Sequence, residues 1–189
     1  MRQVRQVQDL QGFTYLPARV ILPVRDASQR VITINRGTRH GVQEGLVVTV
    51  GANLVGQVLA DPGPSTATVR LITAPNTFLV VRLIPPVPGS TPYEPFVNIR
   101  EANDGQEFWA EIDADATVRA GDLAHLADDT WPTEARGFIV GRVQEIIEHP
   151  DRPYLSRRVI IKPLRPVGRL SNVVVLIPRG TTPPEETAP

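Results

Sequence analysis

The sequence predicts an all-β protein made of two small six-stranded β-barrel domains, with a short helix stub at the N-terminal end. Three observations support this fold class. Short apolar runs rich in valine, isoleucine and threonine recur along the 189 residues, and these β-branched residues favour strands. The 19 prolines and 14 glycines fall mostly between the runs, as turns require. A proline-rich linker at residues 85–95 divides the runs into two groups of six.

Residues 1–17 are predicted to form the end of a coiled-coil helix followed by a linker. Val4, Val7 and Leu10 recur at helical spacing among glutamine and arginine residues. So short a helix is marginal alone, because isolated helices need about 12–15 residues. We therefore expect the end of a longer helix, which stops within residues 12–17.

The first barrel is predicted to span residues 18–84. Its most informative part is residues 32–58, where short alternating runs are separated by Gly37, Gly41, Gly45 and Gly51. Glycine supplies the positive φ that tight turns between strands require. The six expected strands are residues 18–23, 30–35, 46–50, 54–60, 66–73 and 78–84.

The second barrel is predicted to span residues 96–179, after the stiff proline-rich connector. Its six expected strands are residues 96–100, 107–112, 122–126, 139–148, 154–163 and 173–178. Residues 180–189 are polar and rich in proline, so we expect a disordered tail.

The two halves of the chain share a weak repeat. The pattern V-x-x-G followed by G-x-V occurs twice, at Val42, Gly45, Gly56 and Val58 and again at Val118, Gly121, Gly141 and Val143. This repeat indicates that one β-module has been duplicated.

The composition excludes several classes of protein. The chain has no cysteine, which rules out disulfides, thiolate metal sites and a cysteine nucleophile. No apolar run approaches the roughly 20 residues that span a bilayer, and the first residues are too polar for a signal peptide. The net charge is zero and the aromatic residues are not interleaved with arginines, so we expect no nucleic-acid partner.

We expect no catalytic, cofactor or metal site. His40, His125 and His149 lack the close spacing of metal ligands, and no phosphate-binding glycine motif occurs. Two six-stranded barrels invite comparison with trypsin-like proteases, whose serine nucleophile is flanked by glycines. None of the five serines has that context; they are Ser28, Ser65, Ser90, Ser156 and Ser171. The sequence therefore predicts a protein that is not an enzyme.

Two tryptophans stand out in a chain with few aromatic residues. Trp109 lies in an alternating strand, which favours a place in the core. Trp131 lies in a loop beside Pro132, where it either anchors the loop or contacts a partner, because tryptophan is common at binding hot spots.

Several short motifs follow one another in a characteristic order. In the first half they are ARVI (18–21), TINRGTRHGV (33–42), GLVV (45–48), LVGQV (54–58) and VRLIT (69–73). In the second half they are DAD (113–115), VRAGDL (118–123), GRV (141–143), VIIKP (159–163) and LSNVVVL (170–176). Together they cover residues 18–177, and their order resembles that of the rod-shape-determining protein MreC family.

The resemblance implies a non-enzymatic scaffold of the bacterial cell-wall elongation machinery, which maintains cell shape. It implies a place on the extracytoplasmic (periplasmic) side of the inner membrane, with an anchoring N-terminal helix that this sequence lacks. It also implies self-association and binding to the elongation penicillin-binding transpeptidase and to MreD- and RodA-like membrane proteins. The chain departs from the family pattern at residues 93–106 and 127–132, where the family commonly has glycine-rich stretches.

The contacts with partners are expected to involve strand edges and loops. The loop residues predicted to bind partners are Arg36, Arg39 and His40 in the first barrel and Asp128, Asp129 and Trp131 in the second. Two alternative functions stay open: a degenerate trypsin-like serine protease, and a β-module that binds peptidoglycan or another polysaccharide.

Overall fold

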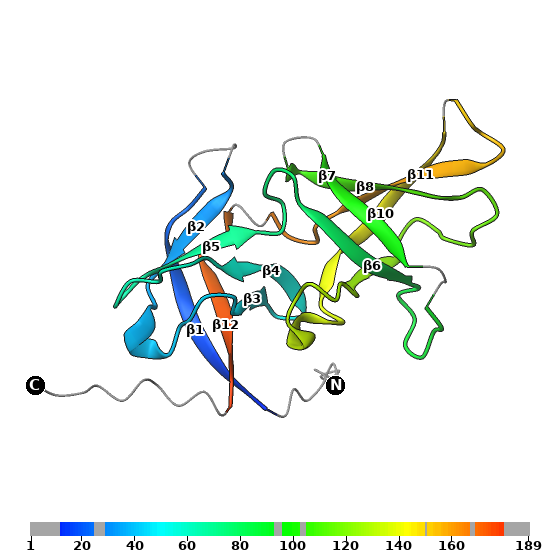
Figure 1. Cartoon of the computed structure of the whole chain (residues 1–189). Helices are drawn as coiled ribbons and strands as arrows, with labels where there is room; N and C mark the ends of the chain where they lie inside the picture. The colour runs from blue at the N-terminus through cyan, green and yellow to red at the C-terminus, as the bar shows by residue number, and fades with distance from the viewer. Residues whose placement is uncertain are drawn as a thin grey trace, which may run out of the picture.

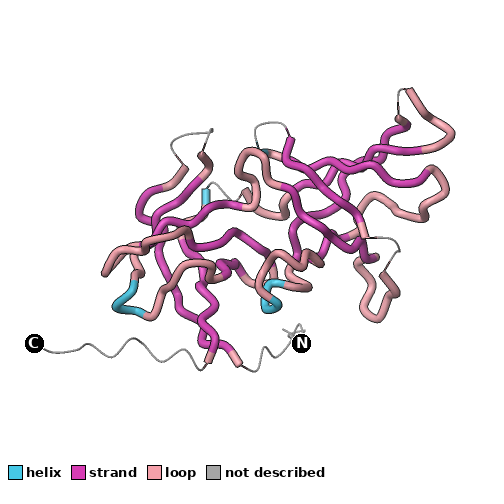
Figure 2. Tube along the Cα trace, viewed as in Figure 1, coloured by secondary structure: helices cyan, strands magenta, loops and turns pink. Residues whose placement is uncertain are grey.

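The computed structural model describes residues 12–24, 29–92, 96–102, 105–149, 151–166 and 169–179. Over these residues the chain is almost entirely strand, turn and loop, with only short helical turns (Figures 1 and 2). Its strands are β1 (Phe13–Leu22), β2 (Val31–Ile34), β3 (Val47–Val50), β4 (Asn53–Val58), β5 (Ala67–Leu71), β6 (Phe78–Ile84), β7 (Val97–Ala102), β8 (Glu107–Asp113), β9 (Leu123–Leu126), β10 (Ile139–Glu148), β11 (Ser156–Lys162) and β12 (Asn172–Pro178). The all-β prediction is confirmed, and each expected strand corresponds to an observed one.

Six strands close into a barrel, which we call the first barrel. They pair in the order β1–β2–β5–β4–β3–β12, and β12 pairs with β1 again to complete the circle. In β1, β2, β5 and β12, side chains from every second position point into the interior, as the period-two alternation of a strand requires. Ile34, Val48 and Val175 lie in this core and are fully buried.

The other six strands form a second circle of pairings, which we call the second ring. The order is β6–β7–β8–β11–β10–β9, and β9 pairs with β6 to complete it. Leu83, Ile99, Phe108 and Val159 fill its interior and are fully buried. In Figure 1 the first barrel and the second ring lie side by side, with β3 and β4 at the boundary between them.

The two rings have the same strand order but take their sixth strand from different places in the chain. In the first barrel this strand is β12, which follows β1 to β5 only after the whole second ring. In the second ring it is β6, which directly precedes β7. The two strands take equivalent places in their rings. β12 pairs with β1 and β3 in the first barrel, and β6 pairs with β7 and β9 in the second ring.

This exchange corrects the predicted membership of two strands. Residues 78–84, predicted in the first barrel, belong to the second ring, whereas residues 173–178, predicted in the second barrel, close the first. The proline-rich segment therefore lies between two strands of the same ring. Both strands are short runs of mostly apolar residues, so their sequences carry no signal for the ring that each one completes.

The start of the first barrel also differs from the prediction. Residues 13–17 are predicted as linker, but they form the first half of β1 and pair with β12, with Phe13 opposite Pro178. Pro17 is tolerated because β2 pairs with β1 only around Val20 and Leu22, so one edge of β1 is unpaired at Pro17 within the described part of the chain.

The predicted internal repeat is visible in the hydrogen bonds. Gly45 N–H donates to the Val58 carbonyl at 2.9 Å, and Gly121 N–H donates to the Val143 carbonyl at 2.8 Å. Val58 and Val143 each return a bond to the residue after that glycine, Leu46 and Asp122 respectively. Gly45 and Gly121 both have positive φ, +80° and +99°, which explains the glycine at both positions.

A continuous core joins the first barrel to the second ring. The apolar cluster of the second ring also contains Val47, Leu54, Ile72 and Leu176 from the first-barrel half of the chain. One parallel contact adds to it, where Ile139 N–H donates to the Ala52 carbonyl at 2.9 Å. An interface of fully buried aliphatic side chains holds two units at a fixed angle, so we expect the molecule to behave as one rigid body.

Some predictions lie outside the described residues. These are the helix stub, which falls within residues 1–11, and the tail at residues 180–189. Among the helices that the structure describes, none has the length and apolar character needed to cross a membrane.

Candidate protein-binding surfaces

The first predicted group of contact residues surrounds a single 3-10 turn, η1 (Thr38–His40). Arg36 is half-buried and donates from Nη1 to the Asn35 carbonyl at 3.0 Å. His40 is exposed, but its Nδ1 accepts a hydrogen bond from Gly37 N–H at 3.2 Å and so caps the turn. Arg39 is exposed on the same turn. Of the three side chains, Arg39 is therefore the best placed to meet a partner.

Asp128 has a role inside the protein. It is buried, with 6% of its surface exposed. Its carboxylate accepts bonds from Val80 N–H at 3.0 Å and from the N–H and hydroxyl of Thr130 at 2.9 and 2.6 Å. Burial raises the pKa of Asp128, but these hydrogen bonds outweigh burial and hold the pKa below its usual value of 3.8. The carboxylate ties its loop to β6, so we do not retain Asp128 as a partner contact.

Asp129 and Trp131 lie in the same loop, just before the turn η3 (Thr133–Ala135). Asp129 is exposed and pairs with the guanidinium of Arg136. Trp131 is half-buried and packs against the apolar core of the second ring. Loop anchoring is thus the observed role of the Trp131 ring, while Asp129 points to solvent.

The two predicted groups form separate surfaces. In Figure 1 the blue turn η1 lies on the outer side of the first barrel, whereas the yellow-green turn η3 lies at the junction with the second ring. The turn that carries Arg39 therefore lies apart from the turn that follows Asp129 in the chain.

A third surface was missed by the sequence reasoning. On the outer face of the second ring, Phe78, Arg100 and Trp109 stand opposite one another on β6, β7 and β8. The Arg100 guanidinium lies 5.3 Å from the centre of the Phe78 ring and 5.7 Å from the Trp109 ring. Arg158 on β11 lies 4.8 Å from the Trp109 ring on its other side. We call these four residues the arginine–aromatic ladder.

The prediction that Trp109 belongs to the core is wrong. Its neighbours Phe108 and Ala110 point into the ring and are buried, so alternation turns Trp109 outward. Phe108 and Trp109 are both large and aromatic, and hydrophobicity alone cannot decide which of two adjacent aromatics faces inward.

The ladder has the composition of a binding hot spot. Tryptophan and arginine are the residue types that most often dominate the free energy of protein association. Phe78 is 61% exposed, and within the described part of the chain neither Arg100 nor Arg158 forms an ion pair. Two guanidinium groups held beside flat rings suit an anionic or aromatic group of another molecule.

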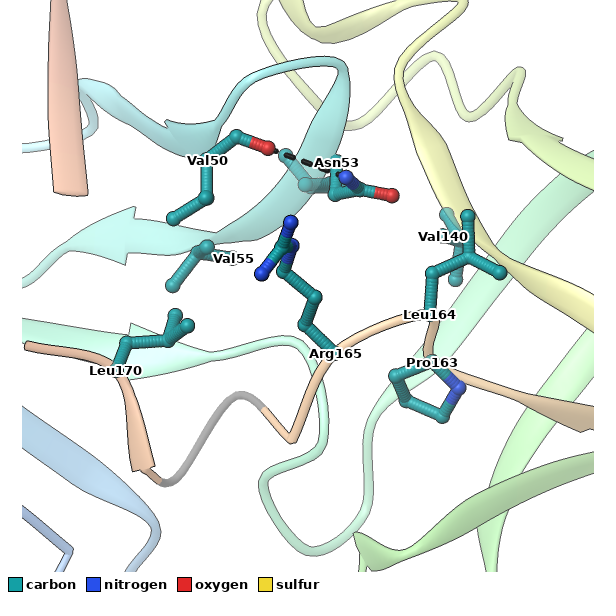
Figure 3. A pocket seen from close by; sticks show the side chains of 9 residues that line it. Val50, Asn53, Val55, Val140, Pro163, Leu164, Arg165 and Leu170 are labelled. Carbon is teal, nitrogen blue, oxygen red and sulfur yellow. Dashed lines mark hydrogen bonds between the residues drawn. The ribbon is translucent and has the colours of Figure 1, made fainter. Parts of the chain in front are cut away.

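The described residues offer little room for a buried substrate at the junction of the two rings. A cavity between β4, residues 163–165 and Leu170 has a volume of about 10 Å³, which is enough for one water molecule. Figure 3 shows Arg165 and Asn53 pointing into it, with the Asn53 amide bonded to the Val50 carbonyl at 3.2 Å. Among the described residues, no group of three or more histidine, aspartate or glutamate side chains could hold a metal ion.

One cluster superficially resembles the catalytic groups of a serine protease. The Ser156 hydroxyl donates to Glu111 at 3.0 Å, and His149 Nε2 lies 3.2 Å from the same Glu111 oxygen. In a catalytic triad the histidine stands between the serine and the acid, so that it can accept the serine proton. In this cluster the carboxylate stands between the serine and the histidine. The cluster therefore lacks the geometry of an acylating triad.

Fold and surface together define a double-ring β-protein whose most distinctive polar features are exposed and suited to contacts with other macromolecules. The sequence matches the family described as "Rod shape-determining protein MreC, barrel core" over residues 20–177. The chain belongs to this family. No curated protein matches the sequence.

Solved structures of MreC proteins share the fold. The chain superposes on MreC of Listeria monocytogenes with a TM-score of 0.68 and 20% identity, covering 88% of this chain and 77% of that one. For MreC of Pseudomonas aeruginosa the TM-score is 0.66 and the identity 21%, with coverages of 86% and 98%. A structure described as a complex between the penicillin-binding protein PBP2 and MreC from Helicobacter pylori gives a TM-score of 0.56 and 16% identity, with coverages of 87% and 98%.

Proposed function

We propose that this protein is a non-enzymatic scaffold of the bacterial cell-wall elongation machinery, which maintains cell shape by holding peptidoglycan-synthesis proteins together. The family match over residues 20–177 carries the proposal. The continuous core between the rings supports it, because a rigid body can hold partners at a fixed distance. In this proposal the protein acts on the periplasmic side of the inner membrane and is anchored there by an N-terminal helix.

The main partner in this proposal is the elongation penicillin-binding transpeptidase, and the contact surface is the arginine–aromatic ladder. The MreC protein from Helicobacter pylori, which has this fold, forms a complex with the penicillin-binding protein PBP2. The ladder supports the assignment through its residue types, since Trp109, Arg100 and Arg158 form a preorganised patch.

Self-association and binding to MreD- and RodA-like membrane proteins belong to the same proposal. Arg39 on the first barrel and Asp129 at the junction are exposed and opposite in charge. We assign these two residues to the additional contacts, because charged residues at the rim of an interface set orientation and association rate.

The proposal is tested with the membrane-anchored protein in cells. After chemical cross-linking and detergent extraction, the tagged protein should recover the transpeptidase, and Trp109→Ala should reduce that recovery. Tyr15→Ala serves as the control, because Tyr15 is an exposed aromatic residue of the first barrel outside the ladder and its loss should leave recovery unchanged. Failure of the unaltered protein to recover the transpeptidase would contradict the proposed partner.

The peptidoglycan-binding alternative makes a different prediction for the same surface. Exposed aromatic rings can stack on sugars as well as on protein groups. If the ladder binds polysaccharide, the purified chain sediments with purified peptidoglycan and Trp109→Ala stays in solution. A protein scaffold stays in solution in both cases.

A further inference from the structure

An opening in the second ring begins beyond the Arg100–Trp109 pair of the ladder, where β7 and β8 separate. Among the described residues, their pairing covers only the hairpin end, from Ala102 opposite Glu107 to Arg100 opposite Trp109. Figure 1 shows the two strands diverging from there. Beyond Trp109, β8 continues to Asp113 with β11 as its partner on one edge. Within the described part of the chain, the edge of β8 that faces β7 is left without a strand.

We propose that this opening binds an extended peptide segment of a partner protein, in which basic residues alternate with apolar ones. The inference goes beyond the proposed function, because it concerns a different surface from the ladder and a different kind of contact. We call the site the β7–β8 groove. It lies between the start of β7, the end of β8 and the hairpin that joins β10 to β11.

The size and lining of the groove fit a peptide. It is an open hollow of about 650 Å³, within the range of about 300–1,000 Å³ that ligand clefts occupy. Val97, Ile112 and Val118 form an apolar floor and are nearly buried. Phe96 and Leu155 stand at its walls with 46% and 70% of their surfaces exposed. Apolar side chains of an extended segment would cover these two walls.

The walls are held in place by polar contacts. Glu111 accepts bonds from Ser156 at 3.0 Å and from Arg152 at 3.4 Å, and its Oε1 lies 3.2 Å from His149 Nε2. These contacts fix the β10–β11 hairpin against β8. On the opposite wall, the Arg82 guanidinium lies 4.6 Å from the centre of the Phe96 ring and covers one of its faces. The groove is therefore preformed, which lowers the entropic cost of binding.

The charge of the groove favours a basic segment. Its lining contains three carboxylates, on Glu111, Asp113 and Asp115, against the single guanidinium of Arg152. Arg152 and Glu111 are committed to each other, and the nearby Arg157 donates to the Ala116 carbonyl. Asp113 is exposed and Asp115 is at the rim, and neither forms an ion pair within the described part of the chain. Asp113 and Asp115 therefore leave an unbalanced negative charge at one end of the apolar β7–β8 groove.

Strand addition explains why the segment should be extended. An open strand edge offers backbone N–H and C=O groups to a new strand, whose side chains then point alternately to the floor and to the rim. The pattern expected for the segment follows from this geometry. Every second residue is apolar and meets Val97, Ile112 and Phe96, while lysine or arginine reaches Asp113 and Asp115.

The experiment uses the full chain, isotopically labelled for NMR, and synthetic peptides as probes. One probe alternates arginine and valine, a second alternates glutamate and valine, and a third is the arginine probe with alternate backbone nitrogens methylated. We expect saturable shifts of the backbone amides of β7, the end of β8 and residues 114–118 with the first probe only. Asp113→Asn with Asp115→Asn should weaken that binding about tenfold, because each surface charge contributes modestly.

The control variant is Asp61→Asn, which removes an exposed carboxylate of the first barrel outside the groove lining and should leave the affinity unchanged. Three results would overturn the proposal: equal binding of the methylated probe, shifts spread over acidic residues elsewhere, or shifts at the groove caused by self-association of the chain without peptide. Variants at Asp113 and Asp115 keep the fold intact because both side chains lie at the surface.

Discussion

At the scale of single residues, Asp128 shows how a loop is fixed to a barrel. Its two carboxylate oxygens accept three hydrogen bonds, one from β6 and two from Thr130. The sequence predicted a partner contact at this position because Asp128 lies in the loop that holds Trp131. The distance of 48 residues between Asp128 and Val80 explains why local reasoning could not find the true role.

Asp128→Asn should lower the free energy of unfolding by about 1–3 kcal/mol at neutral pH, because an amide NH₂ then faces a backbone donor. The pKa of Asp128 is lower in the folded state than in the unfolded state, so its stabilisation is complete above the unfolded value and is lost as pH falls through the folded value. The difference between wild type and variant, measured by denaturant unfolding, should therefore shrink as the pH is lowered below the ordinary aspartate pKa of 3.8. A difference that grows on acidification would contradict this assignment.

Gly56 is a second residue whose role is set by its neighbours. A Cβ atom at Gly56 would lie 2.0 Å from the carbonyl oxygen of Arg70, on the adjacent strand. Gly141, its counterpart in the repeat, would place a Cβ 2.6 Å from the carbonyl of Lys162. The glycine of the G-x-V pattern thus marks a position where two strands approach closely. The sequence alone shows the pattern, but only the structure shows this close approach.

Gly56→Ala should destabilise the protein by about 3 kcal/mol, because the backbone of β5 must move to admit a methyl group. Thermal or denaturant unfolding measures the loss. Gly63→Ala is a matched control in the same barrel, since its Cβ would meet its nearest atoms at an ordinary 3.5 Å. Similar losses at both positions would show that the close contact at Gly56 is not the cause.

At the scale of strands, the sequence contained the elements but not their partners. Apolar alternation and turn residues are local signals, and they located each described strand, with the largest error at the start of β1. The pairing of a strand with its neighbours depends on which ring still lacks a strand at that position. That information is spread over the whole chain, so the exchange of β6 and β12 could not be predicted.

The pairing of β12 with β1 can be tested by cross-linking, because the chain has no cysteine of its own. Thr14 and Ile177 lie opposite each other on the two strands. Thr14→Cys combined with Ile177→Cys should form an intramolecular disulfide on mild oxidation, seen by mass spectrometry, since opposite residues bring their Cβ atoms within reach. Thr14→Cys combined with Ile160→Cys on β11 should not. Failure of the Thr14 and Ile177 pair to cross-link would contradict the pairing of β12 with β1.

At the scale of the whole molecule, the shared core couples the two rings. Leu54 and Leu176 of the first barrel are buried in the same cluster as Phe108 and Val140 of the second ring. Separation of the rings would expose these side chains, which costs about 1.5–3 kcal/mol for each fully buried one. A scaffold that holds partners at a fixed distance needs this coupling between its two rings.

Ile34→Ala tests the coupling, because Ile34 lies inside the first barrel and both tryptophans lie in the second ring. The variant should lose about 2–5 kcal/mol. Tryptophan fluorescence should report the same lowered midpoint of denaturation as circular dichroism. If the fluorescence transition stays at the wild-type midpoint, the rings unfold independently.

The arginine–aromatic ladder links the residue scale to the function of the whole molecule, because its four side chains form the surface that we propose binds the transpeptidase. The measurement that tests its role most directly is the equilibrium affinity of the purified chain for the extracytoplasmic domain of the elongation transpeptidase. We expect Trp109→Ala to weaken binding about thirtyfold, as truncation of a hot-spot residue does. Tyr15→Ala, which removes an aromatic side chain 46% exposed on the first barrel, should bind like wild type. Equal affinities for all three proteins would contradict the ladder as the partner surface.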